Sequence, residues 1–517
     1  MKTTLSLVLL FVSLGLSCEA GDLVTMGVAR LRANDTNLDG TGITVGQAEA
    51  QATGNNDWEV NPPNAGQVAS LFAWINTNGS STQFPNSLGT ESGHADGVGY
   101  CFYGGAAGVA PGVLHVDNYE ADYFYFMVVA GGLAITDNVV NQSFIFNGGT
   151  PPQTTVDSTY DTCMANTGIL FCSAVGNGGP PSAPGTAYNG LGAGAYATGA
   201  ASSVGPTSDN GRSKPDLVAP GFETSFSTPY VAGAAAVLLQ SAARGDGGPD
   251  TSAAGDMRTI KALLLNGAIK PGDWTHTPPA PLDPRYGAGV LNLFYSQQQL
   301  AAGRQSYGVS QPIPAGSAHP PGTPSSIIPS LLGWDYATAS SSPVEDIVNH
   351  YYFDNSANPA AALTLTATLV WNRGAGRTNI NNLALFLYNS ANGGLVTNSV
   401  STVDNVQHIY VPSLPPGQYD LQVVKYGGFS EVTLSETYAL AFQFYPISPL
   451  PLNLSLSGGA AVVSWPWTPT LFNLQQTTNL SPPTSWSPVP AAGLITNTTV
   501  SVTLNPAASP AFYRLSR

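Results

Sequence analysis

Two different spacings of apolar residues divide the chain of 517 residues. Up to about residue 305, short apolar runs alternate with helical segments rich in small residues. Strands that alternate with helices predict an α/β fold, with a mostly parallel sheet flanked by helices on both faces. Strands are predicted at 42–50, 112–119, 138–146 and 168–177, and helices at 93–102, 160–166, 228–243 and 257–268. Catalytic groups are then expected at the carboxyl ends of these strands.

Beyond residue 330 the apolar positions recur at every second residue, which is the spacing of half-buried strands. Runs at 362–372, 382–389, 408–414, 418–426 and 437–445, separated by turn residues, predict an antiparallel β-sandwich over 331–447. A stretch rich in Pro, Gly and Ser at 306–330 predicts a linker before it. After a second Pro-rich break, residues 448–517 predict a small C-terminal β-domain.

The first 20 residues have the composition of a secretory signal peptide. Lys2 precedes the apolar run LSLVLLFVSLGL, and the small-residue end CEA follows it. No later stretch is long and apolar enough to predict a membrane span. We therefore expect a secreted, extracellular protein without membrane insertion, whose first domain covers residues 21–305.

Charge and cysteines narrow the function classes. Acidic residues outnumber basic ones 31 to 16, and the net charge of −15 argues against nucleic acid as a partner. Cys101, Cys163 and Cys172 follow the predicted signal, and their spacing resembles no zinc site. Cys163 and Cys172 could pair or remain two buried thiols, and the sequence leaves both open.

The stretch TSFSTPYVAGAAAVLLQ, residues 224–240, places a Thr-Ser pair at the start of a helix that is apolar nearly all round. Such a helix must be buried, and a serine at its start can be a cap or a nucleophile. His94 stands at the start of another small-residue helix, GHADGVG. Asn177, between glycines in AVGNGG, suits a developing oxyanion, although a simple turn would explain it too.

Taken in order, GHADGVG, GVAPG, AVGNGG, KPDLVAPG and TSFSTPYVAGAAA resemble the subtilisin-like (S8) serine peptidases over roughly residues 25–300. The resemblance implies that Ser225 is the nucleophile, His94 the general base and Asn177 the oxyanion-hole amide. It also implies a substrate-binding strand and its facing wall, formed by Ser143, Phe144, Ile145, Phe146 and Gly176.

The chain departs from the family pattern at several positions. Glu49 stands where the triad Asp is usual, and we expect its carboxylate to orient His94. Asp57 and Asp96 are poorer substitutes because neither ends a predicted strand. Glu223 replaces a usual Gly, and only two residues separate APG from TS.

Two further departures concern the substrate cleft. Ile145 and Phe146 replace glycines, so they are expected to narrow the non-prime cleft and disfavour large residues before the scissile bond. The alternative is that both side chains turn into the core.

These observations predict a secreted serine endopeptidase that acts on proteins or peptides through an acyl-enzyme. No cofactor and no metal ligands are expected; a structural calcium ion is not indicated, because the loop that holds one in many relatives is short. One alternative is a catalytically impaired scaffold that binds a surface or carbohydrate. A sedolisin-type acid peptidase is disfavoured by the context of His94. The two β-domains either shield the catalytic domain or contact a surface or polysaccharide.

Overall fold

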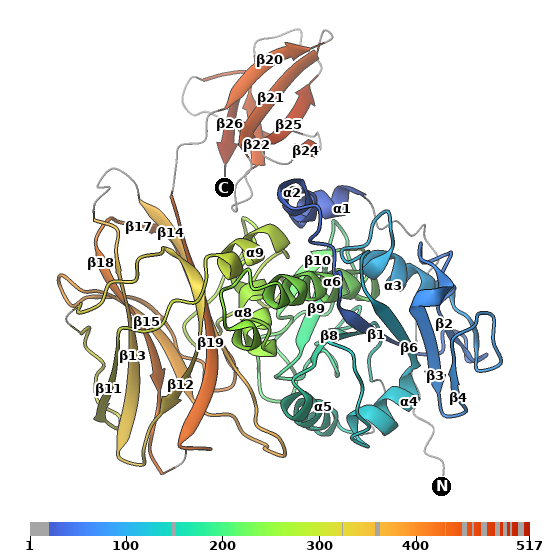
Figure 1. Cartoon of the computed structure of the whole chain (residues 1–517). Helices are drawn as coiled ribbons and strands as arrows, with labels where there is room; N and C mark the ends of the chain where they lie inside the picture. Colours follow the sequence, from blue (N-terminus) through green and yellow to red (C-terminus); the bar gives the residue numbers. More distant parts are fainter. Residues whose placement is uncertain are drawn as a thin grey trace.

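The computed structural model of the chain describes residues 20–146, 151–322, 324–356, 362–429 and 431–446, and parts of 452–516. Residues 1–19 of the predicted signal peptide lie outside the described residues. Figure 1 shows an α/β domain, a β-sandwich beside its helices α8 (Met257–Asn266) and α9 (Leu293–Ala301), and a small β-unit at the end of the chain.

The α/β domain is built on an eight-stranded sheet in the described part of the chain, with the order β10-β9-β8-β7-β1-β6-β3-β4. Neighbouring strands are parallel except β3 and β4, which are antiparallel. The strands are β1 (Thr44–Glu49), β3 (Phe72–Asn76), β4 (Gly79–Ser81), β6 (His115–Glu120), β7 (Val139–Gln142), β8 (Leu170–Ala174), β9 (Leu191–Tyr196) and β10 (Leu217–Pro220). A separate pair is formed by β2 (Asp57–Glu59) and β5 (Thr90–Glu91). The predicted α/β class with a mostly parallel sheet is confirmed.

Strand order reverses at β1, which lies between β6 and β7. Such a switch point opens a crevice at the carboxyl ends of the strands, where side chains from several loops can meet. Glu49 is the last residue of β1, so it lies at the edge of the sheet where this crevice is expected.

Helices cover the sheet (Figure 1), and α6 is buried over nearly its whole length. Its Gly233 lets α3 approach closely, because a Cβ there would lie 2.7 Å from Cβ of Val109 and 3.2 Å from the carbonyl of Phe102. The helices are α1 (Ala20–Thr25), α2 (Val28–Asn34), α3 (Gly93–Tyr103), α4 (Ala121–Tyr123), α5 (Gln153–Thr167), α6 (Thr224–Ala243), α7 (Thr251–Ala254), α8 (Met257–Asn266) and α9 (Leu293–Ala301), with short turns η1 (Ala69–Leu71) and η2 (Phe124–Val129).

The sandwich consists of one sheet in the order β11-β13-β18-β15-β16 and another in the order β12-β19-β14-β17. Its strands are β11 (Val309–Pro314), β12 (Leu332–Ser340), β13 (Glu345–Asp354), β14 (Leu363–Trp371), β15 (Leu383–Asn389), β16 (Leu395–Ser399), β17 (Val406–Leu414), β18 (Gln418–Lys425) and β19 (Ser435–Pro446). The segment 306–330, expected as a linker, contains β11, which pairs antiparallel with β13. The prolines of β11 made this segment look like a linker in the sequence, but a strand at the edge of a sheet tolerates proline.

The α/β domain and the sandwich share one hydrophobic core. Trp334, Val370, Val406, Ala439 and Ala441 of the sandwich belong to the same buried cluster as the α/β domain's own apolar residues. The indole of Trp334 also donates a hydrogen bond to the carbonyl of Leu300 on α9, at 3.1 Å. The two domains therefore form a continuous packed unit.

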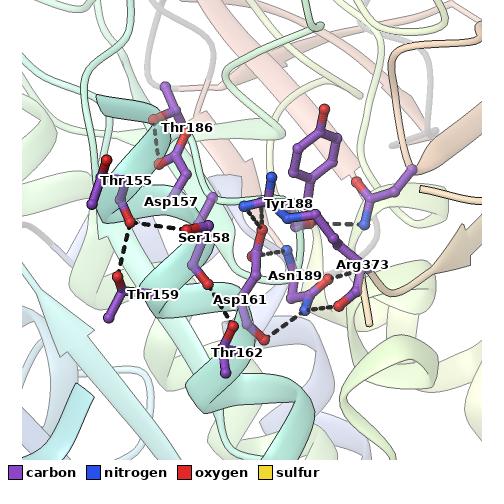
Figure 2. A network of polar contacts seen from close by, with 12 residues as sticks. Thr155, Asp157, Ser158, Thr159, Asp161, Thr162, Thr186, Tyr188, Asn189 and Arg373 are labelled. Atoms are coloured by element: carbon purple, nitrogen blue, oxygen red, sulfur yellow. Dashed lines mark hydrogen bonds and ion pairs between the residues drawn. The ribbon is translucent and has the colours of Figure 1, made fainter. Parts of the chain in front are cut away.

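A polar network continues this interface beside α5 (Figure 2). The guanidinium of Arg373, from the sandwich, forms an ion pair with Asp161 at 2.6 Å. Asn189 joins the same residues, because its Nδ2 donates to the carbonyls of Asp161 and Arg373 and its Oδ1 accepts the N–H of Arg373. The ring of Tyr188 lies between Arg212 and Arg373, with their guanidinium carbons 4.3 and 4.5 Å from its centroid.

The described part of the last unit contains two small antiparallel sheets around Val463, Trp465, Leu474, Val502 and Leu504. The strands are β20 (Asn453–Ser457), β21 (Ala460–Pro466), β22 (Asn473–Thr477), β23 (Ser487–Pro488), β24 (Leu494–Thr496), β25 (Thr499–Leu504) and β26 (Phe512–Ser516).

One alternative left open by the sequence, the pairing of Cys163 with Cys172, is resolved by the fold. Cys163 and Cys172 are free and buried rather than paired, and burial raises the pKa of the Cys163 thiol to about 11. Within the described residues, no helix combines the length and apolar character that crossing a bilayer requires.

Candidate active site

Ser225 lies in the first turn of α6 and is buried. Pro229, four residues later, has no N–H, so the carbonyl of Ser225 lacks its usual helical donor. The hydroxyl of Ser143 donates to that carbonyl at 2.8 Å, and Ser225 Oγ donates to the carbonyl of Ser143 at 3.4 Å. Two hydrogen bonds, one from each residue, therefore join Ser225 to Ser143, the residue that follows β7.

His94 and Glu49 are in direct contact. Glu49 ends β1, and its Oε2 lies 3.0 Å from Nδ1 of His94 in the first turn of α3. Both side chains are buried, with 1 % of Glu49 and 4 % of His94 exposed. The imidazole also packs 5.6 Å, between ring centroids, from Phe226, the residue after Ser225. The imidazole therefore lies beside the start of α6, with a carboxylate behind it.

The two other acids considered from the sequence are engaged elsewhere. Asp57 begins β2 and accepts the N–H of Thr53 with both carboxylate oxygens. Asp96 accepts the N–H of Asn61 at 2.6 Å. Burial, together with the neighbouring Glu91 carboxylate, raises the pKa of Asp96 to about 7.

Asn177 reaches the start of α6 from the loop after β8. Its Oδ1 accepts hydrogen bonds from the N–H and the hydroxyl of Thr224, at 2.9 and 2.7 Å. Because the amide oxygen is occupied in this way, the amide presents its Nδ2–H donors to a further acceptor. Gly176, with φ of +104°, allows the sharp turn of the chain that brings Asn177 there. A donor held one residue from Ser225 is suited to a developing oxyanion.

The predicted substrate-binding residues separate into two groups. Ile145 lies beside Gly176, because a Cβ on that glycine would be 3.6 Å from Ile145 Cδ1. Phe144 is buried, and Phe146 packs against Tyr125 at 4.9 Å between ring centroids. Phe146 was expected to narrow the cleft, but it packs into the core, where aromatic neighbours accommodate a large ring. That Ile145 narrows the cleft stays a prediction.

A main-chain hydrogen bond joins the two walls that carry these residues. The N–H of Phe146 donates to the carbonyl of Ala183 at 2.8 Å. This hydrogen bond therefore holds residues 143–146 against the segment that follows Gly176.

Sequence reasoning missed one residue that contacts this group. Gln47, fully buried on β1, donates from Nε2 to Glu49 Oε1 at 2.9 Å. The signal was a long polar side chain two positions before Glu49, in an otherwise apolar strand, since residues at this spacing share one face.

No group of three or more histidine, cysteine, aspartate or glutamate side chains among the described residues is placed to hold a metal ion. The described contacts place an imidazole with a carboxylate behind it, and a primary amide, against the first turn of α6, which carries the Ser225 hydroxyl. This set can activate a hydroxyl as a nucleophile and stabilise an oxyanion.

Three solved structures show distant likeness. The serine protease MycP1, an essential component of the type VII (ESX-1) secretion system, is 15 % identical over 57 % of this chain and 93 % of its own, with a TM-score of 0.35. Tripeptidyl peptidase 2 (TPP II) is 12 % identical over 75 % of this chain and 43 % of its own, with a TM-score of 0.32. The family 11 carbohydrate-binding module of the cellulosomal cellulase Lic26A-Cel5E of Clostridium thermocellum is 12 % identical over 28 % of this chain and 90 % of its own, with a TM-score of 0.15. No curated protein matches the chain.

A family match is more specific. Residues 133–289 match Peptidase_S8, the subtilase family, which supports a serine peptidase. The matched segment contains Ser143, Asn177 and Ser225, whereas Glu49 and His94 precede it. The match agrees with the resemblance seen in the motifs, and it supports a subtilisin-like serine peptidase.

Proposed function

We propose that this protein is a serine endopeptidase that cleaves peptide bonds through an acyl-enzyme on Ser225. The observation that carries the proposal is the 3.0 Å contact between Glu49 Oε2 and His94 Nδ1, in a buried site beside the first turn of α6. A carboxylate at Nδ1 selects the tautomer in which Nε2 can accept a proton.

The proposed reaction begins when Ser225 Oγ attacks the substrate carbonyl and His94 takes its proton. Glu49 stabilises the imidazolium that forms. The negative oxygen of the tetrahedral intermediate accepts hydrogen bonds from Asn177 Nδ2 and is favoured by the positive end of the α6 dipole. His94 then protonates the leaving amine. Water attacks the acyl-enzyme by the same route and releases Ser225.

A fluorophosphonate probe tests the proposal, because it labels an activated serine. We expect the purified protein to be labelled and Ser225→Ala to be unlabelled. Ser227→Ala is the matched control, since Ser227 lies on the same helix turn but donates to the carbonyl of Pro220. A folded wild-type protein that remains unlabelled would contradict the proposal and favour a catalytically silent scaffold.

We further propose that the enzyme prefers small residues before the scissile bond. Ile145 beside Gly176, and the hydrogen bond that joins Phe146 to Ala183, support a shallow primary pocket. Cleavage of a peptide library should then give small residues at this position. Ile145→Gly should raise kcat/KM for Phe or Leu there by about 10–200-fold, with Ile145→Val intermediate. A wild-type preference for Phe, Tyr or Leu would overturn the shallow pocket.

Export is a separate part of the proposal and rests on residues 1–20. Expression in a secreting host should release a protein that lacks this segment, and N-terminal sequencing of the released protein tests it. Retention of the segment would contradict cleavage. Contact of the β-units with a surface or polysaccharide stays a prediction.

A further inference from the structure

The carboxylate of Glu49 is held at both oxygens. Oε2 faces His94, and Oε1 accepts a hydrogen bond from Gln47 Nε2 at 2.9 Å. The same Nε2 donates to the carbonyl of Ala95 at 2.9 Å. Ala95 follows His94 on α3, so one amide attaches Glu49 to the first turn of the helix that carries the imidazole.

Tyr103 fixes the orientation of this amide. It lies at the other end of α3, and its hydroxyl donates to Gln47 Oε1. Burial and the nearby charge of Glu49 raise the pKa of Tyr103 well above its ordinary value, so the hydroxyl keeps its proton. Because Oε1 of Gln47 accepts from Tyr103, Nε2 must point to Glu49 and Ala95.

Gly99 provides the space for the Tyr103 ring. A Cβ at Gly99 would lie 2.7 Å from the Tyr103 hydroxyl oxygen and 3.0 Å from ring carbons. On another side the ring meets Phe72 edge-on, with centroids 5.7 Å apart. Glycine within a helix costs about 1 kcal/mol relative to alanine. Here it leaves room for a phenol that reaches back along α3 to β1.

We infer that Gln47, oriented by Tyr103, is a positioning residue for Glu49 and, through Glu49, for His94; the inference rests on the proposed function. Glutamate has one more rotatable side-chain bond than the aspartate usual at this place in the family. A hydrogen bond to Oε1 restricts that bond and keeps Oε2 aimed at Nδ1. Among the described residues, the side-chain hydrogen bonds of Gln47 and Tyr103 go to Glu49, Ala95 and each other and not to Ser225, so their effect should fall on the chemical step.

The test removes the amide and the hydroxyl together. The double variant Gln47→Leu/Tyr103→Phe leaves no unpaired group between these two side chains, but Glu49 Oε1 and the Ala95 carbonyl lose the donor that Gln47 supplies. Tyr103→Phe alone is the milder variant, should the double variant fold poorly. The matched control is Tyr160→Phe, because Tyr160 is equally buried and donates to a buried glutamine, Gln142 of β7, at 2.6 Å.

We expect kcat of the double variant to fall about 10–100-fold, as when outer hydrogen-bond partners of metal ligands are removed, with KM unchanged. The acidic limb of the pH–rate profile should move to lower pH, because a freely rotating carboxylate stabilises the imidazolium less. Tyr103→Phe should show a smaller fall, and Tyr160→Phe none.

A measurement that does not need turnover separates this inference from the proposed function. The Nδ1 proton of a histidine bound to a carboxylate gives a far-downfield NMR resonance, which should be sharp in the wild type and broadened or shifted in Tyr103→Phe. Unchanged kcat, pH profile and resonance in both folded variants would overturn the inference. A protein that neither cleaves nor labels, yet loses the resonance in these variants, would overturn the function and retain the positioning.

Discussion

Glu49 and Asp161 are two buried carboxylates of the same domain, each 1 % exposed, and their partners differ in kind. Asp161 accepts the N–H groups of Tyr188 and Asn189 at 3.2 and 2.8 Å, and it pairs with Arg373 (Figure 2). Glu49 meets the neutral amide of Gln47 and the imidazole of His94. One acid has a permanent cation and the other has a partner that can gain or lose its charge.

The difference follows from what each acid does. A guanidinium keeps its charge at every accessible pH, so Asp161 is compensated at all times. Burial nevertheless raises the pKa of Asp161, which illustrates how costly desolvation is even for a paired acid. Glu49 is compensated in full only when His94 carries a proton, the state through which the proposed reaction passes. The Gln47 amide is neutral. It can therefore hold the Glu49 carboxylate in place without cancelling the negative charge that stabilises the imidazolium of His94.

The largest expected effect concerns Glu49. Glu49→Gln preserves shape but presents a neutral amide to His94, so kcat should fall by about 10⁴-fold, as on loss of a triad carboxylate. Peptide hydrolysis measures the loss, and circular dichroism checks the fold. Asp161→Asn should leave the turnover of folded protein unchanged. Undiminished activity in Glu49→Gln would mean that its carboxylate is not part of the mechanism.

The next effect concerns the permanent pair. Arg373→Met leaves Asp161 buried without its cation, which should lower the free energy of unfolding by about 3–5 kcal/mol. Urea unfolding measures it, and Asp161→Asn/Arg373→Met should recover much of the loss. Arg244→Met, at a half-exposed pair with Asp35 and Asp246, is the control and should cost about 0–1 kcal/mol. If Arg373→Met and Arg244→Met lowered the free energy of unfolding equally, the buried pair of Arg373 with Asp161 would be no more important for stability than the half-exposed one.

The smallest effect concerns Asp96, an acid near His94 that lacks a cationic partner in the described part of the chain. Its pKa of about 7 is raised from 3.8, so the folded state binds its proton more tightly than the unfolded state. The stability that this protonation supplies is present below about pH 4 and is lost as pH rises through 7. Asp96→Asn should therefore flatten the pH dependence of the unfolding midpoint in this window and leave activity in place. An unchanged slope would contradict the role of Asp96.

The catalytic candidates could be read from the sequence because each stands where an element ends. Glu49 closes a strand, Asn177 follows one, and His94 and Ser225 begin helices, but their proposed roles came from the resemblance to the subtilisin-like peptidases. Gln47 and Tyr103 could not be joined in this way. The contact between Gln47 and Tyr103 depends on how α3 packs on β1 and on the absence of a side chain at Gly99. Both are features of the tertiary structure.

The domain plan shows the same limit. Alternation predicted the sandwich, but β11 was hidden by Pro312 and Pro314 in a segment that looked like a linker. Ile145 and Phe146 are adjacent and similar in character, yet only the aromatic neighbours of Phe146 decide that it turns inward. Such choices are made by partners distant in sequence.

The prolines of β11 also bear on how copies of this protein meet one another. β11 is the outermost strand of its sheet, and the border of a sheet is a template on which a foreign strand can add. Proline is accepted in such a strand where its nitrogen faces away from the neighbour. Pro312 and Pro314 have no N–H group, so the free edge of β11 lacks two backbone donors. A strand from a second molecule could not form a complete set of main-chain hydrogen bonds with it. We therefore expect this edge to resist the addition of a strand from a second molecule.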